Sequence, residues 1–139
     1  MRRVTIDHID IRVRDLGASR TFYEAALKPL GLSIVTDRAD EVDFGFDSLD
    51  DFGIHSGGVP STGVHVAFLA RSAQEVDEFY RAALAVGASS DAPPGLHPEY
   101  SPGYYAAFVL DPDGNVVEAV CMGVGHAEGA DAGRPGLVT

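Results

Sequence analysis

The sequence predicts an α+β fold built from two βαβββ modules that are related by a pseudo-twofold axis. Three features predict it: an internal repeat, a strand followed by an amphipathic helix in each copy, and a hairpin at the end of each copy. When the chain is shifted against itself by 57 positions, seven residues between positions 8 and 27 are identical, including the pairs His8 with His65 and Phe22 with Phe79. Two copies with this period indicate a paired domain and not an open solenoid.

Each copy begins with a predicted strand that carries a histidine. Residues 4–13 alternate with the two-residue period of a strand, which places His8 opposite the apolar face. The same alternation in the second copy places His65 opposite Val66 and Phe68. The two histidines are therefore expected to point in equivalent directions.

A helix is predicted after each strand, with an apolar stripe that covers the sheet. In the second copy Ser72 and Glu75 form a capping box, and apolar residues follow with helical spacing. In the first copy the stripe ends around Pro29 and Gly31. The stripes consist of Phe22, Tyr23, Ala26, Leu27 and Leu30 in the first copy, and of Val76, Phe79, Tyr80, Ala83 and Leu84 in the second.

Each copy ends in a predicted hairpin. Residues 42–46 and 51–55 flank a short polar link in the first copy, as residues 104–110 and 115–121 do in the second. Residues 89–103 hold four of the eight prolines, and we interpret them as an ordered loop that lies beside the site.

The domain organisation follows from the repeat and the composition. The 139 residues, 45% of them hydrophobic, have the length and the core of one domain. We expect module 1 at residues 4–58, module 2 at 62–123, and a mobile C-terminal tail at 124–139, which is rich in Gly and Ala.

The charge and the cysteine content exclude several classes of partner. The formal charge of −11 repels nucleic acid and anionic membranes, so neither is expected as a partner. The longest apolar run, residues 104–110, is too short to span a bilayer. Cys121 is the single cysteine, which rules out an intrachain disulfide and fits a reducing compartment, so a cytoplasmic location is expected.

Several motifs resemble those of the vicinal oxygen chelate superfamily, which includes glyoxalase I, extradiol dioxygenases and bleomycin-resistance proteins. They are His8 in VTIDHIDIRV, the FYEAAL and FYRAAL helices, His65 in GVHVAF, and Glu118 in LDPDGNVVEAV, and together they extend over residues 4–122. The resemblance implies a glyoxalase-like cup of curled mixed sheets, a divalent metal ion held by His8, His65 and Glu118, and a homodimer.

The implied ligand set is chemically reasonable. Two imidazoles and a carboxylate suit Fe²⁺, Mn²⁺, Ni²⁺, Co²⁺ or Zn²⁺ and leave coordination positions for water and for vicinal oxygens of a substrate. Glu118 lies between Val116 and Val120 on its strand face, where an ionised carboxylate needs a cation or hydrogen-bond donors. The alternative is that the histidines are structural and that no metal binds.

A fourth ligand is not expected. Aligning the second hairpins of the two copies at an offset of 64 places Ile54 opposite Glu118, and Ile54 is assigned to substrate binding. Glyoxalase I proteins typically have a glutamate there, so the four-ligand glutathione-hemithioacetal isomerase becomes less favoured. His55 is expected on the other face unless a bulge follows Gly53.

The remaining site residues are aromatic or acid–base groups near residues 97–105. Glu118, Tyr105 and His97 are the candidate catalytic residues, and Tyr100 and Tyr104 are candidate substrate contacts. Of the two adjacent tyrosines, one phenol is expected to reach the cup while its neighbour packs outside. His97 is either an acid or base near the substrate or a surface histidine.

The leading hypothesis is a divalent-metal-dependent enzyme with lyase, isomerase or ring-cleaving dioxygenase activity on a small substrate that chelates the ion through vicinal oxygens. The alternative is a ligand-binding protein of the bleomycin-resistance kind that acts without metal. A third hypothesis is a structural relic with no metal. Whether one chain or two chains build the site stays open at this point.

Overall fold

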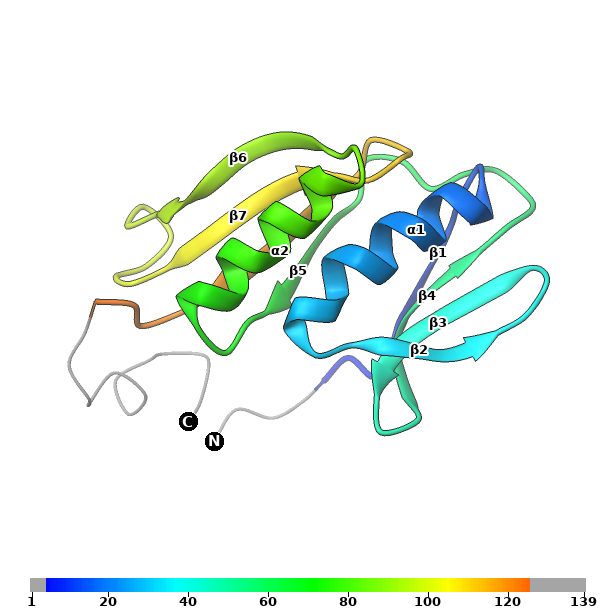
Figure 1. Ribbon diagram of the computed structural model, residues 1–139, viewed down its shortest axis with the longest axis horizontal. Coiled ribbons are helices and arrows are strands. Elements are labelled where there is room, and N and C mark those ends of the chain that lie inside the picture. The colour runs from blue at the N-terminus through cyan, green and yellow to red at the C-terminus, as the bar shows by residue number, and fades with distance from the viewer. Residues whose placement is uncertain (1–4, 126–139) are drawn as a thin grey trace.

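The computed structural model describes residues 5–125, which form two βαβββ modules (Figure 1). Module 1 contains β1 (Ile9–Arg12), α1 (Leu16–Leu27), a 3-10 turn η1 (Lys28–Leu30), β2 (Ser33–Asp37), β3 (Glu41–Phe46) and β4 (Leu49–His55). Module 2 contains β5 (His65–Leu69), α2 (Ala73–Ala85), β6 (Ser89–Leu96), β7 (Tyr105–Leu110) and β8 (Val116–Cys121). The predicted fold class is confirmed. The tail that we expect to be mobile lies, from residue 126 on, outside the described residues.

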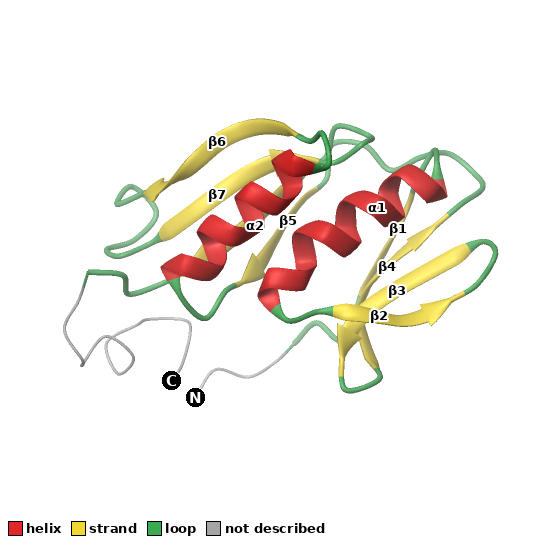
Figure 2. Ribbon diagram, in the orientation of Figure 1, coloured by secondary structure: helices red, strands yellow, loops and turns green. Residues whose placement is uncertain are grey.

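Each module forms a four-stranded mixed sheet, in the order β1-β4-β3-β2 or β5-β8-β7-β6. The first strand of each module runs parallel to the last, and the other neighbours are antiparallel. Both helices lie on the same side of the two sheets and run next to each other (Figures 1 and 2). Within residues 5–125 no helix lies against the opposite face of each sheet, and we call this face the open face.

The helix stripes build one core that both modules share. Tyr23 of α1 contacts Phe44 and Phe52 of the first sheet, and Phe79 of α2 lies in the same cluster. These four rings are at most 1% exposed, which makes them a large part of the hydrophobic stabilisation. No helix within residues 5–125 is long and apolar enough to cross a membrane.

The helix start predicted at Ser72 is confirmed. The Ser72 hydroxyl accepts a hydrogen bond from the Glu75 N–H at 3.1 Å. The Glu75 carboxylate accepts in turn from the backbone N–H of Arg71, at 2.9 Å, one residue before the position of a standard capping box.

The prediction of a loop over residues 89–103 is wrong for its first half, because Ser89–Leu96 forms strand β6. Pro93 and Pro94 are compatible with this strand because β6 is the edge of its sheet and its pairing with β7 is interrupted between Ala92 and Gly95. The nitrogen atoms of these two prolines need no hydrogen-bond partner in the sheet, so the prolines do not end the strand.

A buried polar cluster fixes the turn that leads into β8. Asp111 is 5% exposed and accepts hydrogen bonds from the Tyr23 hydroxyl at 2.6 Å and from the backbone N–H of Asp113 and of Asn115, both at 2.9 Å. Asn115 also accepts from the N–H of Val64, just before β5. The cluster thus joins α1, the start of β5 and the start of β8, and holds in place the two strands that carry His65 and Glu118.

Candidate metal centre on the open face

Glu118 is a buried carboxylate in the middle of β8. Its exposed fraction is 2%, although it lies on the open face, where Val120 and Phe108 form a small apolar cluster beside it. Strand β5 runs parallel to β8 with Ala67 opposite Glu118, so His65 lies two residues away on the same face. The His65 Nε2 atom is 2.7 Å from Glu118 Oε1.

Tyr104 is the second partner of Glu118. Its hydroxyl donates a short hydrogen bond to Glu118 Oε2, so the two carboxylate oxygens have different partners. Burial, and then the hydrogen bond to Glu118, raise the pKa of Tyr104 above its usual value. The Tyr104 hydroxyl therefore stays protonated at neutral pH and is a hydrogen-bond donor to this carboxylate.

Aromatic rings form a wall beside the His65–Glu118 pair. Phe108 contacts His65 and His97, with ring centroids 6.1 Å and 5.3 Å apart. His97 stacks on Tyr100 at 5.7 Å, and Tyr100 meets Tyr104 edge to face at 5.0 Å. The structure thus brings Tyr100, Tyr104 and His97 together with Glu118. Phe108 was not predicted as a site residue. The signal that identifies it is its position opposite Glu118 in the hairpin.

Tyr105 lies on the opposite side of the sheet. Its hydroxyl donates to Asp77 of α2 at 2.7 Å, and its ring packs against the core under the helices. The hydrogen bond to Asp77 and burial raise the pKa of Tyr105. Of the two adjacent tyrosines, Tyr104 is therefore the one that reaches the open face, and the geometry does not support the catalytic role expected for Tyr105.

His8 stands apart from the other two predicted metal ligands. It precedes β1, its side chain is 48% exposed, and its Nδ1 atom is 3.0 Å from Asp7. The hydrogen bond to Asp7, followed by the charge of Asp50, raises the pKa of His8. The described residues of one chain do not bring His8 into a common ligand group with His65 and Glu118.

The expected position of Ile54 is wrong by one residue. Asp10 on β1 is opposite Gly53, just as Ala67 on β5 is opposite Glu118, so Gly53 is the counterpart of Glu118. Ile54 is completely buried in the core under the helices and does not line the open face, where a substrate contact was expected. The cause is the offset used to align the hairpins: Asp43 pairs with Gly53 as Phe108 pairs with Glu118, so the two hairpins correspond at an offset of 65 and not 64.

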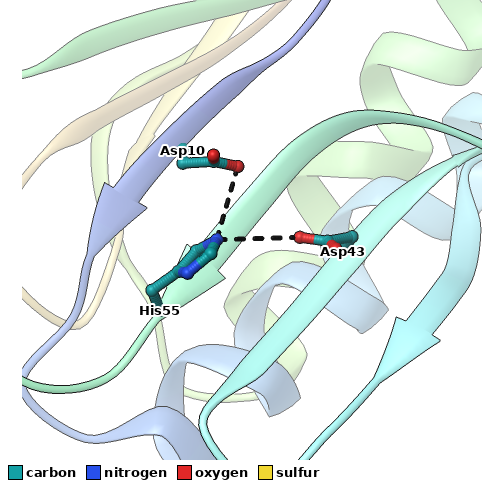
Figure 3. Close-up of side chains that lie close together, drawn as sticks. All are labelled: Asp10, Asp43 and His55. Carbon is teal, nitrogen blue, oxygen red and sulfur yellow. Dashed lines mark ion pairs between the residues drawn. The ribbon is translucent and has the colours of Figure 1, made fainter.

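His55 therefore lies on the open face, together with Asp10 and Asp43 (Figure 3). Its Nε2 atom is 3.4 Å from Asp10 Oδ1 and 3.9 Å from Asp43 Oδ1. Asp43 is 5% exposed, and burial together with the neighbouring Glu41 carboxyl raises its pKa to about 6. Sequence reasoning missed this cluster because its members come from three different strands.

A hollow of about 540 Å³ lies away from all of these residues. Phe22, Ala88 and Pro112 are among its lining residues, so it opens on the helix side of the molecule, near the turn before β8. None of the predicted site residues lines it.

The fold and the site together define an α+β domain with duplicated βαβββ modules and a histidine–carboxylate cluster on an open sheet face. Residues 5–119 match the family model described as Glyoxalase/Bleomycin resistance protein/Dioxygenase superfamily, and the chain belongs to this superfamily. A search of curated proteins finds no match for the chain.

Solved structures support the assignment of the fold. The chain is similar to a glyoxalase/bleomycin resistance protein from Albidiferax ferrireducens T118, with 29% identity, a TM-score of 0.71, and coverage of 84% of this chain and 97% of that one. A glyoxalase-related enzyme from Fulvimarina pelagi has 21% identity, a TM-score of 0.66, and coverage of 84% and 87%. The fosfomycin resistance protein FosX from Listeria monocytogenes, complexed with Mn(II) and 1S,2S-dihydroxypropylphosphonic acid, has 20% identity, a TM-score of 0.62, and coverage of 91% and 93%.

Proposed function

We propose that the protein is a divalent-metal-dependent enzyme that acts on a small substrate binding through two adjacent oxygen atoms. His8, His65 and Glu118 are the proposed metal ligands. The observation that carries the proposal is the buried Glu118 carboxylate, 2% exposed, with the half-exposed His65 imidazole 2.7 Å from it on the open face. A buried carboxylate next to an accessible imidazole is a donor pair that suits a divalent cation.

The local chemistry fits such an ion. Valines flank Glu118 along β8, and the donors near its carboxylate are the Tyr104 hydroxyl and the His65 ring. The imidazole–carboxylate donor set suits Fe²⁺, Mn²⁺, Ni²⁺, Co²⁺ or Zn²⁺. When bound, the ion supplies Lewis-acid stabilisation of the negative charge that develops on the substrate oxygens.

The other residues of the open face orient the metal ligands and exchange protons with the substrate. Tyr104 holds Glu118 Oε2, which keeps Oε1 directed toward His65, and fixing a ligand in this way is the usual task of residues around a metal. His97 has its Nδ1 atom 3.0 Å from Glu99, which leaves Nε2 as the atom that accepts a proton from the substrate. We assign Tyr100 and Phe108 to the wall of the substrate site.

We further propose that a second copy of the chain completes the site in a homodimer. The support is that His8 is exposed and is not gathered with His65 and Glu118 within the described part of one chain. An exposed ligand-type residue of one copy is thus available to the open face of another. The nature of the ion then separates the reaction classes, since ring cleavage with oxygen requires Fe²⁺, whereas isomerase or lyase chemistry also proceeds with Zn²⁺, Ni²⁺ or Co²⁺.

The test is a Co²⁺ titration of metal-free protein that carries no histidine tag. In the parent protein, one Co²⁺ ion is expected to bind to His65 and Glu118. His65→Ala and Glu118→Gln are each expected to lower the affinity for this ion by at least about tenfold, because two remaining ligands hold an exchangeable ion poorly. His97→Ala is the matched control and is expected to keep the affinity for Co²⁺. If His65→Ala and Glu118→Gln both bind as the parent does, the proposal is wrong.

A specific observation favours one second candidate, a ligand-binding protein of the bleomycin-resistance kind. The ring centroids of His97 and Tyr100 are 5.7 Å apart, and those of Tyr100 and Tyr104 are 5.0 Å apart. The chain also has a formal charge of −11. An aromatic wall on an acidic protein suits a planar cationic ligand. This candidate predicts that such a ligand binds metal-free protein as tightly as metal-loaded protein.

A further inference from the structure

We propose that Asp10, Asp43 and His55 form a second divalent-cation site, on the open face of module 1. It shares no residue with the His8, His65 and Glu118 set and does not rest on the function proposed above. Its three side chains come from the neighbouring strands β1, β3 and β4 and point toward one another (Figure 3).

The strand register explains why these side chains converge. Asp10 and Asp43 are both directly opposite Gly53, one on each side of β4. His55 follows two residues later on the same face of β4. One ligand atom from each of the three residues lies within 4.8 Å of the other two. The backbone pairing alone therefore brings two carboxylates and one imidazole over the same glycine.

Gly53 leaves the space that these ligand atoms surround. A Cβ atom at Gly53 would lie 2.3 Å from Asp43 Oδ1, 2.4 Å from Asp10 Oδ1 and 3.3 Å from His55 Nε2. Any side chain at this position would displace both carboxylates. The glycine thus provides a small cradle over the backbone of β4, with two carboxylate oxygens at its sides.

Buried polar atoms that lack hydrogen-bond partners point into this cradle. Asp43 is 5% exposed, and its Oδ1 atom makes no hydrogen bond. The His55 Nε2 atom is also buried and makes none. Native proteins rarely leave two such atoms unsatisfied next to each other, and a cation between them satisfies both.

The distances fit ligands of a shared ion better than a simple ion pair. His55 Nε2 lies 3.4 Å from Asp10, 3.7 Å from Glu41 and 3.9 Å from Asp43, and it makes no hydrogen bond with any of them. A histidine that pairs with a single carboxylate through a charge-assisted hydrogen bond lies about 2.7–2.9 Å from it. Two ligand atoms bound at ~2.1 Å to one tetrahedral ion lie roughly 3.4 Å apart.

The donor set defines the class of ion. One imidazole and two carboxylates suit Mn²⁺, Co²⁺ or Zn²⁺ and disfavour soft ions that require thiolates. Glu41 is the nearest additional carboxylate, and its other oxygen lies 3.6 Å from Arg38, so we assign it an outer position that orients His55.

The experiment uses Mn²⁺ alone, added to metal-free, full-length protein and followed by electron paramagnetic resonance. The starting protein is the double variant His65→Ala/Glu118→Gln, which lacks the ligands of the other proposed site. It is expected to bind one Mn²⁺ per chain and to lose at least about tenfold in affinity when Asp43→Asn is added, because one of the three ligands is then neutral. Asp91→Asn, an exposed aspartate of β6, is the matched control and is expected to change nothing.

Two further variants keep the test decisive if Asp43→Asn is unstable. Asp10→Asn changes a half-exposed ligand, and Gly53→Ala keeps every ligand but places a methyl group in the cradle. Both are expected to weaken Mn²⁺ binding in the double variant by a similar factor. In the nuclear magnetic resonance spectrum, Mn²⁺ is expected to broaden the ring signals of His55 before those of His97.

The outcomes separate the two proposals. No Mn²⁺ bound by the double variant, or unchanged binding in Asp10→Asn and Gly53→Ala, overturns the site in module 1. Unchanged Co²⁺ binding in the single variants His65→Ala and Glu118→Gln overturns the proposed function instead. The Mn²⁺ comparisons are all made in the same double variant, and the Co²⁺ test leaves Asp10, Asp43 and His55 unaltered.

Discussion

At the scale of single residues, the environment of Glu118 determines what the open face of module 2 is able to do. Its two oxygens have different partners, His65 on one side and Tyr104 on the other. A carboxylate that is oriented in this way presents one oxygen in a fixed direction, which is the property required of a metal ligand. The hydroxyl of Tyr104 is therefore a positioning group.

Tyr104→Phe removes the hydroxyl that holds Glu118 Oε2. Metal affinity is expected to fall by about tenfold, as is usual when an outer hydrogen bond to a ligand is lost. Tyr105→Phe is a matched control, because its hydroxyl bonds to Asp77 on the helix side, and it should leave the affinity unchanged. The measurement is a Co²⁺ titration of both variants. Equal losses in the two variants would argue against a specific role for Tyr104.

Ile54→Glu tests the corrected register of β4. The new carboxylate would lie in the core among helix-facing residues, where Ile54 has no exposed surface. We expect the free energy of unfolding to fall by roughly 3–5 kcal/mol, the effect of burying an unpaired charge. Denaturant unfolding measures the change, and Ile54→Val, expected to cost about 0.5–1.5 kcal/mol, is the control. A stable variant that binds metal more tightly would restore the alignment of the hairpins at an offset of 64.

At the scale of elements, much of the fold was predictable because each signal was local. The repeat, the two helix stripes and the alternation within the β5 and β8 strands are each visible in one segment of the sequence, and the family resemblance is what joined His65 with Glu118. Strand β6 was not predictable, since two prolines are tolerated only because the strand is an edge. The prediction for Ile54 was wrong because residue alternation does not determine the offset at which the two hairpins correspond, and the strand pairing sets this offset at 65 and not 64.

The candidate sites show the same limit. Glu118 and His65 were identified because they occur in recognisable motifs. The cluster of Asp10, Asp43 and His55 depends on which strands are neighbours, and one sequence does not contain that information.

Tyr23→Phe tests how the turn before β8 is held. The Tyr23 hydroxyl is the donor nearest to the buried Asp111 Oδ2 atom, at 2.6 Å, and the other donor to this oxygen, Asn115 Nδ2, is 3.4 Å away. The variant is expected to lose about 1–3 kcal/mol of unfolding free energy, the cost of a buried polar atom with too few partners. Tyr80→Phe removes an exposed hydrogen bond to Ser90 and should change the unfolding free energy by less than about 0.5 kcal/mol. Similar losses in both variants would contradict the assigned role of Asp111.

At the scale of the whole molecule, the two modules share one core through their helices but keep separate sheets. In the described part of the chain this arrangement leaves both open faces free of helices, and it does not bring His8 together with His65 and Glu118. The proposed homodimer follows from that separation. It predicts that ligands of one metal ion come from two copies of the chain.

Mixing two defective variants tests this prediction. His8→Ala and Glu118→Gln, each also carrying Asp43→Asn to remove the site of module 1, are unfolded together and refolded as a mixture. If ligands come from two copies, each mixed dimer contains one intact site, and the mixture regains about a quarter of the sites of the Asp43→Asn parent. Co²⁺ binding measures the number of sites. No recovery in a mixture that sedimentation shows to be dimeric would place all three ligands in one chain.

The most direct test of the central claim is a crystal structure of the protein with Mn²⁺, in which anomalous scattering locates the ion. We predict an ion bonded to Glu118 Oε1 and His65 Nε2, with His8 of a second copy as the third protein ligand. An occupied His55 cluster beside a Glu118 that has no ion, or no ion at all at saturating Mn²⁺, would contradict the claim that Glu118 is the centre of a metal-dependent active site.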